Sequence, residues 1–451
     1  MPTRPLSLLT ALLFVAGGLT PKPVFAQAAP ALRAGPMLGY NTLREVAVWV
    51  QTAGPASEVR LRYYPVDSAA HVLHSEPAAT AARDAFCATL VADSLLPATT
   101  YRYEVLVDGA PVDAGEALAF ATPALWEFRA DPPEVTFALG SCYYANEPAF
   151  DRPGRGYGGE YGIFAAIDSL RPDFMLWLGD NIYLRPGDFQ TRSGVLHRNS
   201  HQRAVAELQP LLRHTHHYAI WDDHDFGPND ADRSYVHKAW TREAFELFWA
   251  NPPAHHPALA PGIATAFRYA DAEFFLLDDR TFRAPNACQT CDPKPLLGEA
   301  QLDWLVDALV GSTASYKFVA VGGQVLNSVA TYETYVSHHA AERERLLDRI
   351  AAEGIEGVVF LTGDRHHTEL SRVTRGDVEL VDFTVSPLTS GANERSRDEP
   401  NEHRVAGTWV GRRNFGTVTL RGPRTERVAT LRIYDSAGVL LWERDLGSEG
   451  E

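Results

Sequence analysis

The sequence predicts an α/β domain preceded by a small β-sandwich. Over residues 31–125, apolar and polar residues alternate with a period of two, in runs separated by Pro, Gly, Asp and Ser. From residue 135 to about 390, continuous apolar runs instead alternate with amphipathic segments of helical length. The first pattern is typical of half-exposed antiparallel strands, and the second of a sheet that is buried on both faces.

The length and composition agree with a folded protein of two domains. The chain has 451 residues, and single hydrophobic cores rarely grow beyond about 250–300 residues. Its apolar fraction of 45% and charged fraction of 22% are ordinary for globular proteins. The formal net charge is −16. Because such a surface repels phosphate backbones, we expect no binding to nucleic acid.

The N-terminus resembles a secretory signal. Residues 1–26 contain the basic Arg4, an uncharged apolar stretch over 6–19, and Ala26 at a position that suits cleavage after a small residue. The stretch is shorter than the roughly 20 residues that a transmembrane helix needs, and no later segment predicts one. We therefore expect a secreted or periplasmic protein, with a retained N-terminal anchor as the alternative. Removing residues 1–26 leaves 39 basic and 57 acidic residues, a charge of −18.

The predicted sandwich occupies residues 31–125. Its strands correspond to "EVAVWVQT", "EVRLRYYPV", "FCATLVA" and "TTYRYEVLVDG". Short alternating runs at this spacing favour a sandwich of two sheets. The segment "LPATTYRYEV" is similar to a corner of fibronectin type III domains, so we expect a fibronectin- or immunoglobulin-like fold. A Pro-containing linker follows at 122–134.

The second domain is predicted over residues 135–445. Its apolar runs are "VTFALG", "DFMLWLG", "HYAIW", "AEFFLLD", "YKFVAVGG" and "VVFLTG". Helices are expected at 160–170, 200–213, 235–249, 298–310 and 337–353. After residue 405, "NFGTVTLRG" and "RVATLRIYDSAGVLLWERDL" predict a strand and a hairpin that complete the sheet or pack on it.

Three of the four cysteines have a structural explanation. Cys288 and Cys291 form a C-x-x-C in the Pro-rich segment "APNACQTCDPKP", which predicts a short-range disulfide in an oxidising compartment. A zinc half-site or a redox pair is the alternative, but no second C-x-x-C or thioredoxin-like pattern accompanies it. Cys87 lies in the alternating run "DAFCATLVA" and is expected to be a buried small hydrophobe.

Five of the six apolar runs of the second domain end in polar or metal-competent residues. The carboxyl ends of strands meet at one edge of an α/β sheet, so these residues are expected to gather there. Carboxylates and phenolate are hard oxygen ligands, imidazole suits iron or zinc, and thiolate is a soft donor. The pattern predicts a dinuclear metal site, in which two ions bridged by one Asp clamp a phosphoryl group and acidify a water. The residues are Ser141-Cys142-Tyr143, Asp180-Asn181-Ile182-Tyr183, Asp222-Asp223-His224-Asp225, Gln324 with Asn327-Ser328, and Asp364-Arg365-His366-His367.

The motifs "GSC", "LGDNIY", "WDDHD" and "LTGDRHH", in this order, resemble the PhoD-type alkaline phosphatases and phosphodiesterases of the calcineurin-like metallophosphoesterase superfamily. The likeness covers about 135–390, and "LDDRTFRAP" followed by "LLGEAQLDWL" supports it. The resemblance implies a four-layer α/β/β/α sandwich with two metals at the strand ends, preceded by a β-domain. It also implies a secreted, metal-dependent hydrolase of small phosphate esters.

The resemblance assigns four residues to a first metal, Fe3+. Asp180 of the "GD" motif corresponds to the carboxylate that bridges both metals. Tyr183 resembles the phenolate ligand of iron in this family and in purple acid phosphatases. Cys142 corresponds to the thiolate that PhoD enzymes place on the iron, and His366 to the final histidine ligand of that metal.

A second metal, Ca2+ in PhoD enzymes, is expected at oxygen ligands. Asp223 and Asp364 correspond to its carboxylates, and Asn229 in "FGPND" is a further oxygen donor. The superfamily's usual "GNHE" reads "DDHD" here and its "GHxH" reads "GDRH", so oxygen replaces nitrogen. Hard oxygen ligands favour Ca2+, with Zn2+ or Mn2+ as the alternative occupants.

Four further residues are candidates for handling charge and protons. Arg280 in "LDDRTFR" and Arg365 are expected to neutralise developing negative charge, with ordinary salt bridges as the alternative explanation. His224 corresponds to the superfamily histidine that acts as an acid or supports a ligand. Protonation of the leaving alkoxide is assigned to His224 or His367, and the sequence leaves this choice open.

Three other functions remain open at this point. A phosphodiesterase or phospholipase-like enzyme of the same fold would differ in the cleft shape set by loops such as 184–199 and 283–297. A catalytically inactive secreted binding protein would have lost the thiol, carboxylates and imidazole assigned to the metals, and all of these are present. A thiol-disulfide oxidoreductase would rest on the C-x-x-C alone.

Overall fold

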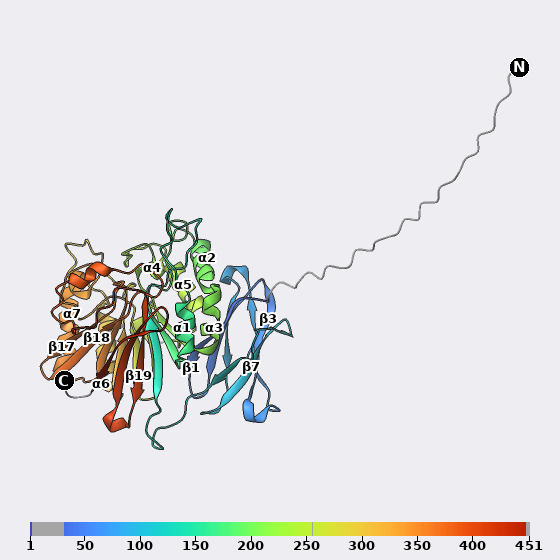
Figure 1. Ribbon diagram of the computed structural model, residues 1–451, viewed down its shortest axis with the longest axis horizontal. Coiled ribbons are helices and arrows are strands. Elements are labelled where there is room, and N and C mark those ends of the chain that lie inside the picture. The colour runs from blue at the N-terminus through green and yellow to red at the C-terminus, as the bar shows by residue number, and fades with distance from the viewer. Residues whose placement is uncertain (2–30, 255, 448–451) are drawn as a thin grey trace. The chain divides into compact units, whose positions relative to one another are not determined.

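The computed structural model describes Met1 and residues 31–254 and 256–447 (Figure 1). Residues from Ala31 onward form one compact unit. Apart from Met1, the expected signal segment 1–26 lies outside the described residues. Within the part of the chain that is described, no helix has the length and apolar character needed to cross a membrane.

A nine-stranded sheet runs through the molecule. Strands β10, β11 and β12 at its centre are parallel, and β19 is antiparallel to β10. The predicted C-terminal strand and hairpin therefore complete this sheet. In spatial order its strands are β21 (Leu440–Leu446), β20 (Val428–Asp435), β19 (Asn414–Arg421), β10 (Val135–Gly140), β11 (Phe174–Leu178), β12 (His216–Ile220), β1 (Leu32–Asn41), β2 (Val46–Thr52) and β6 (Cys87–Ala92).

A separate six-stranded sheet contains the other three predicted apolar runs. Strands β14, β15, β16 and β18 are parallel, whereas β13 and β17 are antiparallel edge strands. Three of the six runs thus lie in each of two sheets, a division that the apolar pattern alone did not specify. The order is β13 (Thr265–Tyr269), β14 (Ala272–Leu276), β15 (Tyr316–Ala320), β16 (Val358–Thr362), β18 (Val378–Thr384) and β17 (Glu369–Arg375).

Helices cover the outer face of each sheet. Four of the five expected helices occur near their predicted positions. The helix expected at 200–213 is instead two helices, α2 and α3, because a short 3-10 turn and Pro210 at the start of α3 interrupt the pattern. The helices are α1 (Ile163–Ser169), α2 (Arg192–Arg203), α3 (Gln209–His214), α4 (Asp223–Phe226), α5 (Lys238–Phe248), α6 (Glu299–Gly311) and α7 (Tyr335–Ala352).

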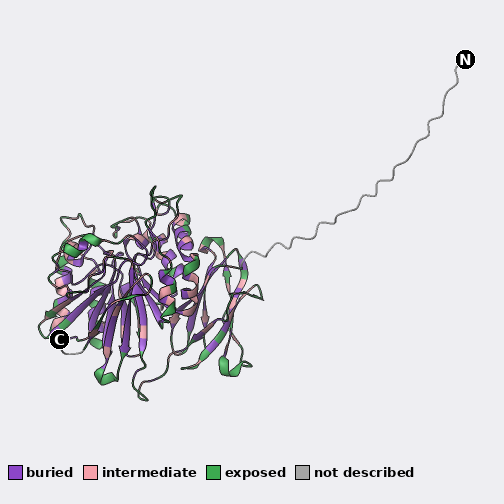
Figure 2. Ribbon diagram, in the orientation of Figure 1, coloured by how far each residue is buried: buried purple, intermediate pink, exposed green. Residues whose placement is uncertain are grey.

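The two sheets pack face to face, which confirms the four-layer α/β/β/α arrangement. Alternate residues of each central strand enter different cores: Phe274 of β14 enters the core between the sheets, whereas Phe275 packs beneath α6 and α7. Phe137 and Phe174 of the first sheet lie 5.2 Å from Phe274 of the second, measured between ring centroids. Figure 2 shows the strands of both sheets as buried and the exposed residues mainly in outer loops and helix faces.

The predicted N-terminal sandwich is present, but one of its layers belongs to the nine-stranded sheet. Strands β1, β2 and β6 pack against a smaller sheet through one apolar core. Strand β1 also pairs with β12, at Leu38 and His216, which makes the sheet continuous. The boundaries 31–125 and 135–445 stay predictions. The smaller sheet contains β4 (Leu73–His74), β3 (Ala56–Pro65), β7 (Thr100–Val107) and β8 (Ala110–Pro111), with β5 (Ala78–Thr80) and β9 (Ala119–Ala121) beside it.

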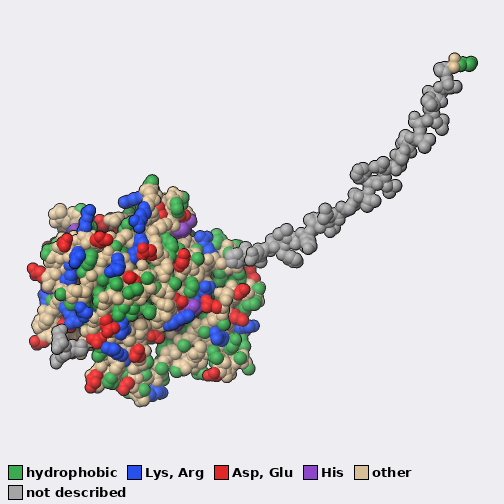
Figure 3. Space-filling view, viewed as in Figure 1, with side chains coloured by type: hydrophobic (Ala, Val, Ile, Leu, Met, Phe, Trp, Pro, Cys, Tyr) green, Lys and Arg blue, Asp and Glu red, His purple; other side chains and the backbone are tan. Residues whose placement is uncertain are grey.

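The structure shows how three of the cysteines are used and how charged side chains are distributed on one face of the molecule. Cys288 and Cys291 form a disulfide, as the sequence predicts, and Cys87 is buried on β6. The face of the molecule in Figure 3 carries basic and acidic side chains interspersed.

His217 on β12 is held as a neutral imidazole. Its Nδ1 accepts a hydrogen bond of 2.9 Å from the indole of Trp177, so its Nε2 carries the proton and donates to the Leu211 carbonyl oxygen at 3.1 Å. Burial lowers the pKa of His217 from its usual 6.5 to about 3. Below pH 6.5 the unfolded chain therefore binds a proton at His217 that the folded chain excludes.

We expect the free energy of unfolding to fall as the pH drops from about 6.5 towards about 3, with His217 contributing about 1.4 kcal/mol per pH unit. Replacing His217 by Asn removes this proton uptake and should flatten the slope by that amount. Urea unfolding at several pH values between 6.5 and 5 measures it. The exposed His71→Asn is the control, and equal slopes for all three proteins would contradict the assignment.

Candidate metal centre

The candidate metal ligands follow the ends of strands from both sheets. Cys142 follows β10 and Asp180 follows β11 in the first sheet, whereas Asp364 and His366 follow β16 in the second. The two sheets approach closely at Gly363. A Cβ on this residue would lie 2.5 Å from the Ser141 side chain and 2.9 Å from the backbone oxygen of Leu178. Only glycine fits without displacement, and this contact joins the two sets of strand ends.

The backbone at these positions is unusual. Cys142, Asp180, Asp364 and His366 have φ angles of +61°, +52°, +62° and +55°. For residues with a side chain this left-handed region is sparsely populated, and such conformations cluster at functional sites because the surrounding structure must compensate for their cost. Four such residues at one junction indicate that the surrounding structure holds the backbone in this conformation and thereby directs these side chains toward one another.

A first group of ligand atoms comes from Cys142, Asp180 and His366. Their sulfur, oxygen and nitrogen atoms all lie within 4.8 Å of one another. The Cys142 Sγ lies 3.6 Å from Asp180 Oδ2. The Tyr183 hydroxyl donates to the same carboxylate oxygen at 3.1 Å and lies 3.2 Å from His366 Nε2. A thiol, a carboxylate, a phenol and an imidazole thus converge.

Two further groups adjoin the first. Asp180, Asp223 and His224 offer ligand atoms within 4.8 Å of one another, as do Asp222, Asp223 and Glu333. Asp180 is therefore common to the first and second groups, and Asp223 to the second and third. Because neighbouring groups share a carboxylate, the arrangement suits ions placed side by side.

The charges of these buried side chains oppose one another. Burial, with a smaller effect from the charge of Asp364, raises the pKa of the Cys142 thiol to about 12. Burial and the neighbouring thiol and carboxylates hold the pKa of Asp180 well above its usual 3.8. Burial and the charge of Asp223 raise that of Asp364 to about 6. Cations would relieve this repulsion and hold the thiol and carboxylates ionised, so the donor set fits metal ions.

A cavity of about 290 Å3 opens beside the second group. Asp223, His224, Asn229 and Asp364 line one part of it, and Asn286 and Tyr332 another. Burial lowers the pKa of His224, against the opposing charge of Asp223. An imidazole and several oxygen atoms therefore face a space large enough for a small ester.

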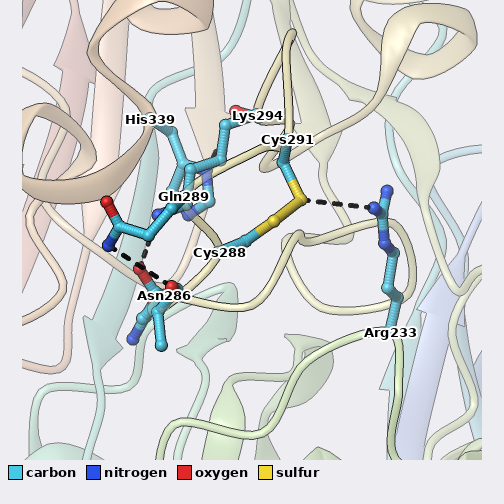
Figure 4. Close-up of a disulfide and its surroundings, with 8 residues drawn as sticks. Arg233, Asn286, Cys288, Gln289, Cys291, Lys294 and His339 are labelled. Atoms are coloured by element: carbon cyan, nitrogen blue, oxygen red, sulfur yellow. Dashed lines mark hydrogen bonds between the residues drawn. A yellow bond between two sulfur atoms is a disulfide. The ribbon is translucent and has the colours of Figure 1, made fainter.

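The disulfide lies in the same segment as Asn286, which lines the cavity. The Asn286 amide donates a 2.9 Å hydrogen bond to Glu333, and the Lys294 amine donates to the Asn286 carbonyl oxygen. Figure 4 shows the Cys288–Cys291 disulfide beside Asn286 and Lys294, with the Arg233 guanidinium directed at the sulfur of Cys291. The segment 283–297, expected to shape the cleft, is thus anchored beside it.

Residues 137–422 match the PhoD-like phosphatase family. The chain belongs to this family. A curated relative, alkaline phosphatase D of Bacillus subtilis (strain 168), is 24% identical over 358 residues, which are 67% of this chain and 58% of the relative. The chain thus spans less than two thirds of that relative's length. Residues 29–124 match a domain of unknown function (DUF7800).

Solved structures support the fold of this PhoD-like chain. A structure of PhoD superposes with a TM-score of 0.73 at 18% identity, covering 94% of this chain and 93% of that one. A purple acid phosphatase from yellow lupin (Lupinus luteus) seeds superposes with a TM-score of 0.67 at 12% identity, covering 91% and 74%. At these identities the superpositions establish the metallophosphoesterase fold.

Of the four residues expected to handle charge and protons in this PhoD-like chain, only His224 belongs to a ligand group. Its ring centroid lies 4.3 Å from that of Tyr183. Arg280 is buried and pairs with Asp222 and Glu333.

Arg365 and His367 lie in a neighbouring polar cluster. Arg365 donates to Gln324 at 2.6 Å and to the Glu399 carboxylate at 2.8 Å. The ring of His367 lies between the Arg365 carbonyl oxygen, at 3.0 Å, and the Glu369 carboxylate, at 3.5 Å. Asn229 is exposed on the cavity wall, outside the three ligand groups.

Sequence reasoning assigned no role to three residues at this junction. Asp222 was expected at the same edge of the sheet as Asp223, but it was given no individual role. Glu333 follows no strand end; burial opposes its ionisation, but Arg280 and Arg283 lower its pKa to about 2. Ser386 donates to the Cys142 sulfur at 3.1 Å and accepts from the His366 backbone N–H at 3.0 Å, and no motif marks it.

Replacing Gly363 by Ala should destabilise the protein by about 1–3 kcal/mol and weaken metal binding, because the added methyl group overpacks the junction of the two sheets. Thermal unfolding and metal titration measure the two effects. Gly54→Ala is the matched control, since a Cβ there meets nothing within 4 Å. If the two variants unfold and bind metal identically, the close contact of the two sheets at Gly363 is not required.

Proposed function

We propose that this chain hydrolyses phosphate esters with the help of two metal ions. The observation that carries the proposal is that Asp180 belongs to two adjacent ligand groups at once. A carboxylate in this position suits a bridge between two ions, which is the arrangement used for phosphoryl transfer to water. The family of the chain supports the same chemistry.

We assign the first group to Fe3+. Cys142, Tyr183 and His366 would hold it together with Asp180, because thiolate, phenolate and imidazole suit iron. The second ion would be Ca2+, held by oxygen atoms of Asp223 and Asp364, with Asn229 as a donor from the cavity wall and Zn2+ or Mn2+ as the alternatives. All of these proposed donors of the second ion are hard oxygen atoms, which favours Ca2+.

When bound, such a metal pair clamps the phosphoryl oxygens and lowers the pKa of water at the site. His224 faces the cavity and lies against Tyr183, so it can donate a proton to the leaving oxygen. Arg280 would act through Asp222, which it holds beside Asp223. Arg365 and His367 would support the backbone that carries Asp364 and His366.

We propose small phosphate esters as substrates. The cavity of about 290 Å3 accepts a compact ester, and the relative from Bacillus subtilis is an alkaline phosphatase by name. Diesters are the competing class of substrate. A loop around Asn286, and not the ligand groups alone, bounds the cavity, so the loop determines whether a second ester substituent fits. We also propose export of the protein, which the Cys288–Cys291 disulfide supports because disulfides persist in oxidising compartments.

The purified protein should contain iron and release the chromophore from a nitrophenyl phosphomonoester, a matching diester, or both. Asp180→Asn should lose about two or more orders of magnitude in kcat/KM, because a neutral amide bridges two cations poorly. Metal analysis and the two assays, run side by side, check this. A wild-type protein without iron and without either activity would sink the proposal.

Cys142→Ala should lose iron, together with any visible absorption that iron causes, and most of the activity, while the fold is retained. The thiol is buried against Asp180 and offers the only sulfur in the ligand groups of the described chain. Metal analysis, absorption spectra and circular dichroism measure these properties. Cys87→Ala is the control, because this buried cysteine lies on β6 in the sandwich. Full activity of Cys142→Ala would disprove the ligand assignment.

A further inference from the structure

Tyr157 lies against the candidate metal centre, although it follows no strand end. It belongs to the glycine-rich segment "GRGYGG". Its hydroxyl oxygen lies 3.1 Å from Nδ1 of His366. The other ring nitrogen, Nε2, lies 3.2 Å from the Tyr183 hydroxyl and faces the first ligand group. The imidazole of His366 is therefore held between two phenols, one at each nitrogen.

The position of Tyr157 is fixed by the surrounding structure. Arg413 donates to the Tyr157 carbonyl oxygen at 3.2 Å and to that of Ser390 at 3.0 Å, which ties the glycine-rich segment to the chain that follows β18. The Tyr157 ring centroid lies 5.0 Å from that of Tyr144 and 6.4 Å from that of Tyr183. The side chain is thus packed in an aromatic cluster while remaining 44% exposed at the rim of the site.

We propose that Tyr157 is a positioning residue for His366, a role that rests on the metal-dependent function proposed above. A neutral imidazole carries one proton, and the hydrogen bond at one nitrogen decides which nitrogen keeps its lone pair. With Nδ1–H donating to the Tyr157 oxygen, the lone pair is on Nε2, directed at the first ligand group. Partners of this kind fix both the tautomer and the orientation of a ligating histidine.

Tyr157 suits this role because a phenol oxygen can accept a hydrogen bond as well as donate one. Its oxygen lies 3.1 Å from Nδ1 of His366 and can therefore accept the proton on that nitrogen.

The test compares Tyr157→Phe with Tyr144→Phe. The first variant removes the oxygen that contacts His366 and keeps the ring packing. The second removes a hydroxyl from the same aromatic cluster, but that hydroxyl donates to Asp151 at 2.7 Å instead. Iron retention is measured by dialysis of each holoprotein against a graded series of chelator concentrations, together with the visible spectrum and the separate values of kcat and KM.

We expect Tyr157→Phe to retain iron about 10- to 100-fold more weakly and to alter the visible spectrum, whereas Tyr144→Phe behaves as the wild type. Thermal unfolding of the metal-free proteins should be the same for wild type and Tyr157→Phe. Unchanged retention in Tyr157→Phe, or equal losses in both variants, would overturn the inference while leaving the metal site intact. A wild-type protein that holds no iron and hydrolyses neither the monoester nor the diester would instead refute the proposed function itself.

Discussion

The face-to-face packing of the two sheets is the interaction on which the rest of the structure depends. Phe137 and Phe174 of one sheet pack against Phe274 of the other, and each buried aromatic ring contributes both apolar burial and specific ring contacts. This packing sets the relation between strands that are far apart in sequence. At the carboxyl ends of the strands, Gly363 lets the second sheet approach Ser141 of the first. Without that approach, Asp364 and His366 would not meet Cys142 and Asp180.

Bringing these side chains together imposes an electrostatic constraint. Part of the buried negative charge is balanced by protein groups, because Arg280 and Arg283 pair with Glu333, and Arg280 also pairs with Asp222. The group of Cys142, Asp180 and His366 has no such partner among the ion pairs of the described residues. Buried anions need a compensating charge, and here a metal ion is the group that the donor set fits. Arg280 and Arg283 thus neutralise the third ligand group, whereas the first group, the proposed iron site, has no arginine partner among the ion pairs of the described residues.

The outer parts of the chain support this junction from different directions. The segment that carries the disulfide places Asn286 on the cavity beside the second ligand group, and the glycine-rich segment places Tyr157 against His366 in the first group. The N-terminal sandwich is joined to the same framework, because β1 pairs with β12. A substrate would therefore meet a wall formed by loops, while the ligands themselves are anchored at the ends of buried strands. Such a division lets the loops of the cavity wall change without moving the candidate metal ligands.

The amino-acid sequence by itself determined the strands, their polar ends and thereby most of the candidate site, because a buried strand that stops at a cluster of ligands is a local pattern. Cys142, Asp180, Asp364 and His366 were predicted in this way, with the family resemblance supplying their expected roles. The resemblance implied two sheets, but the apolar pattern did not show which runs belong to which sheet, because strands that are buried on both faces lose the alternation that distinguishes their two faces. Nor did it reveal Glu333 or Tyr157, which follow no strand end, or Ser386, which follows β18 but has no motif to mark it. Only tertiary packing decided those contacts, since they join segments whose proximity depends on how the two sheets are stacked.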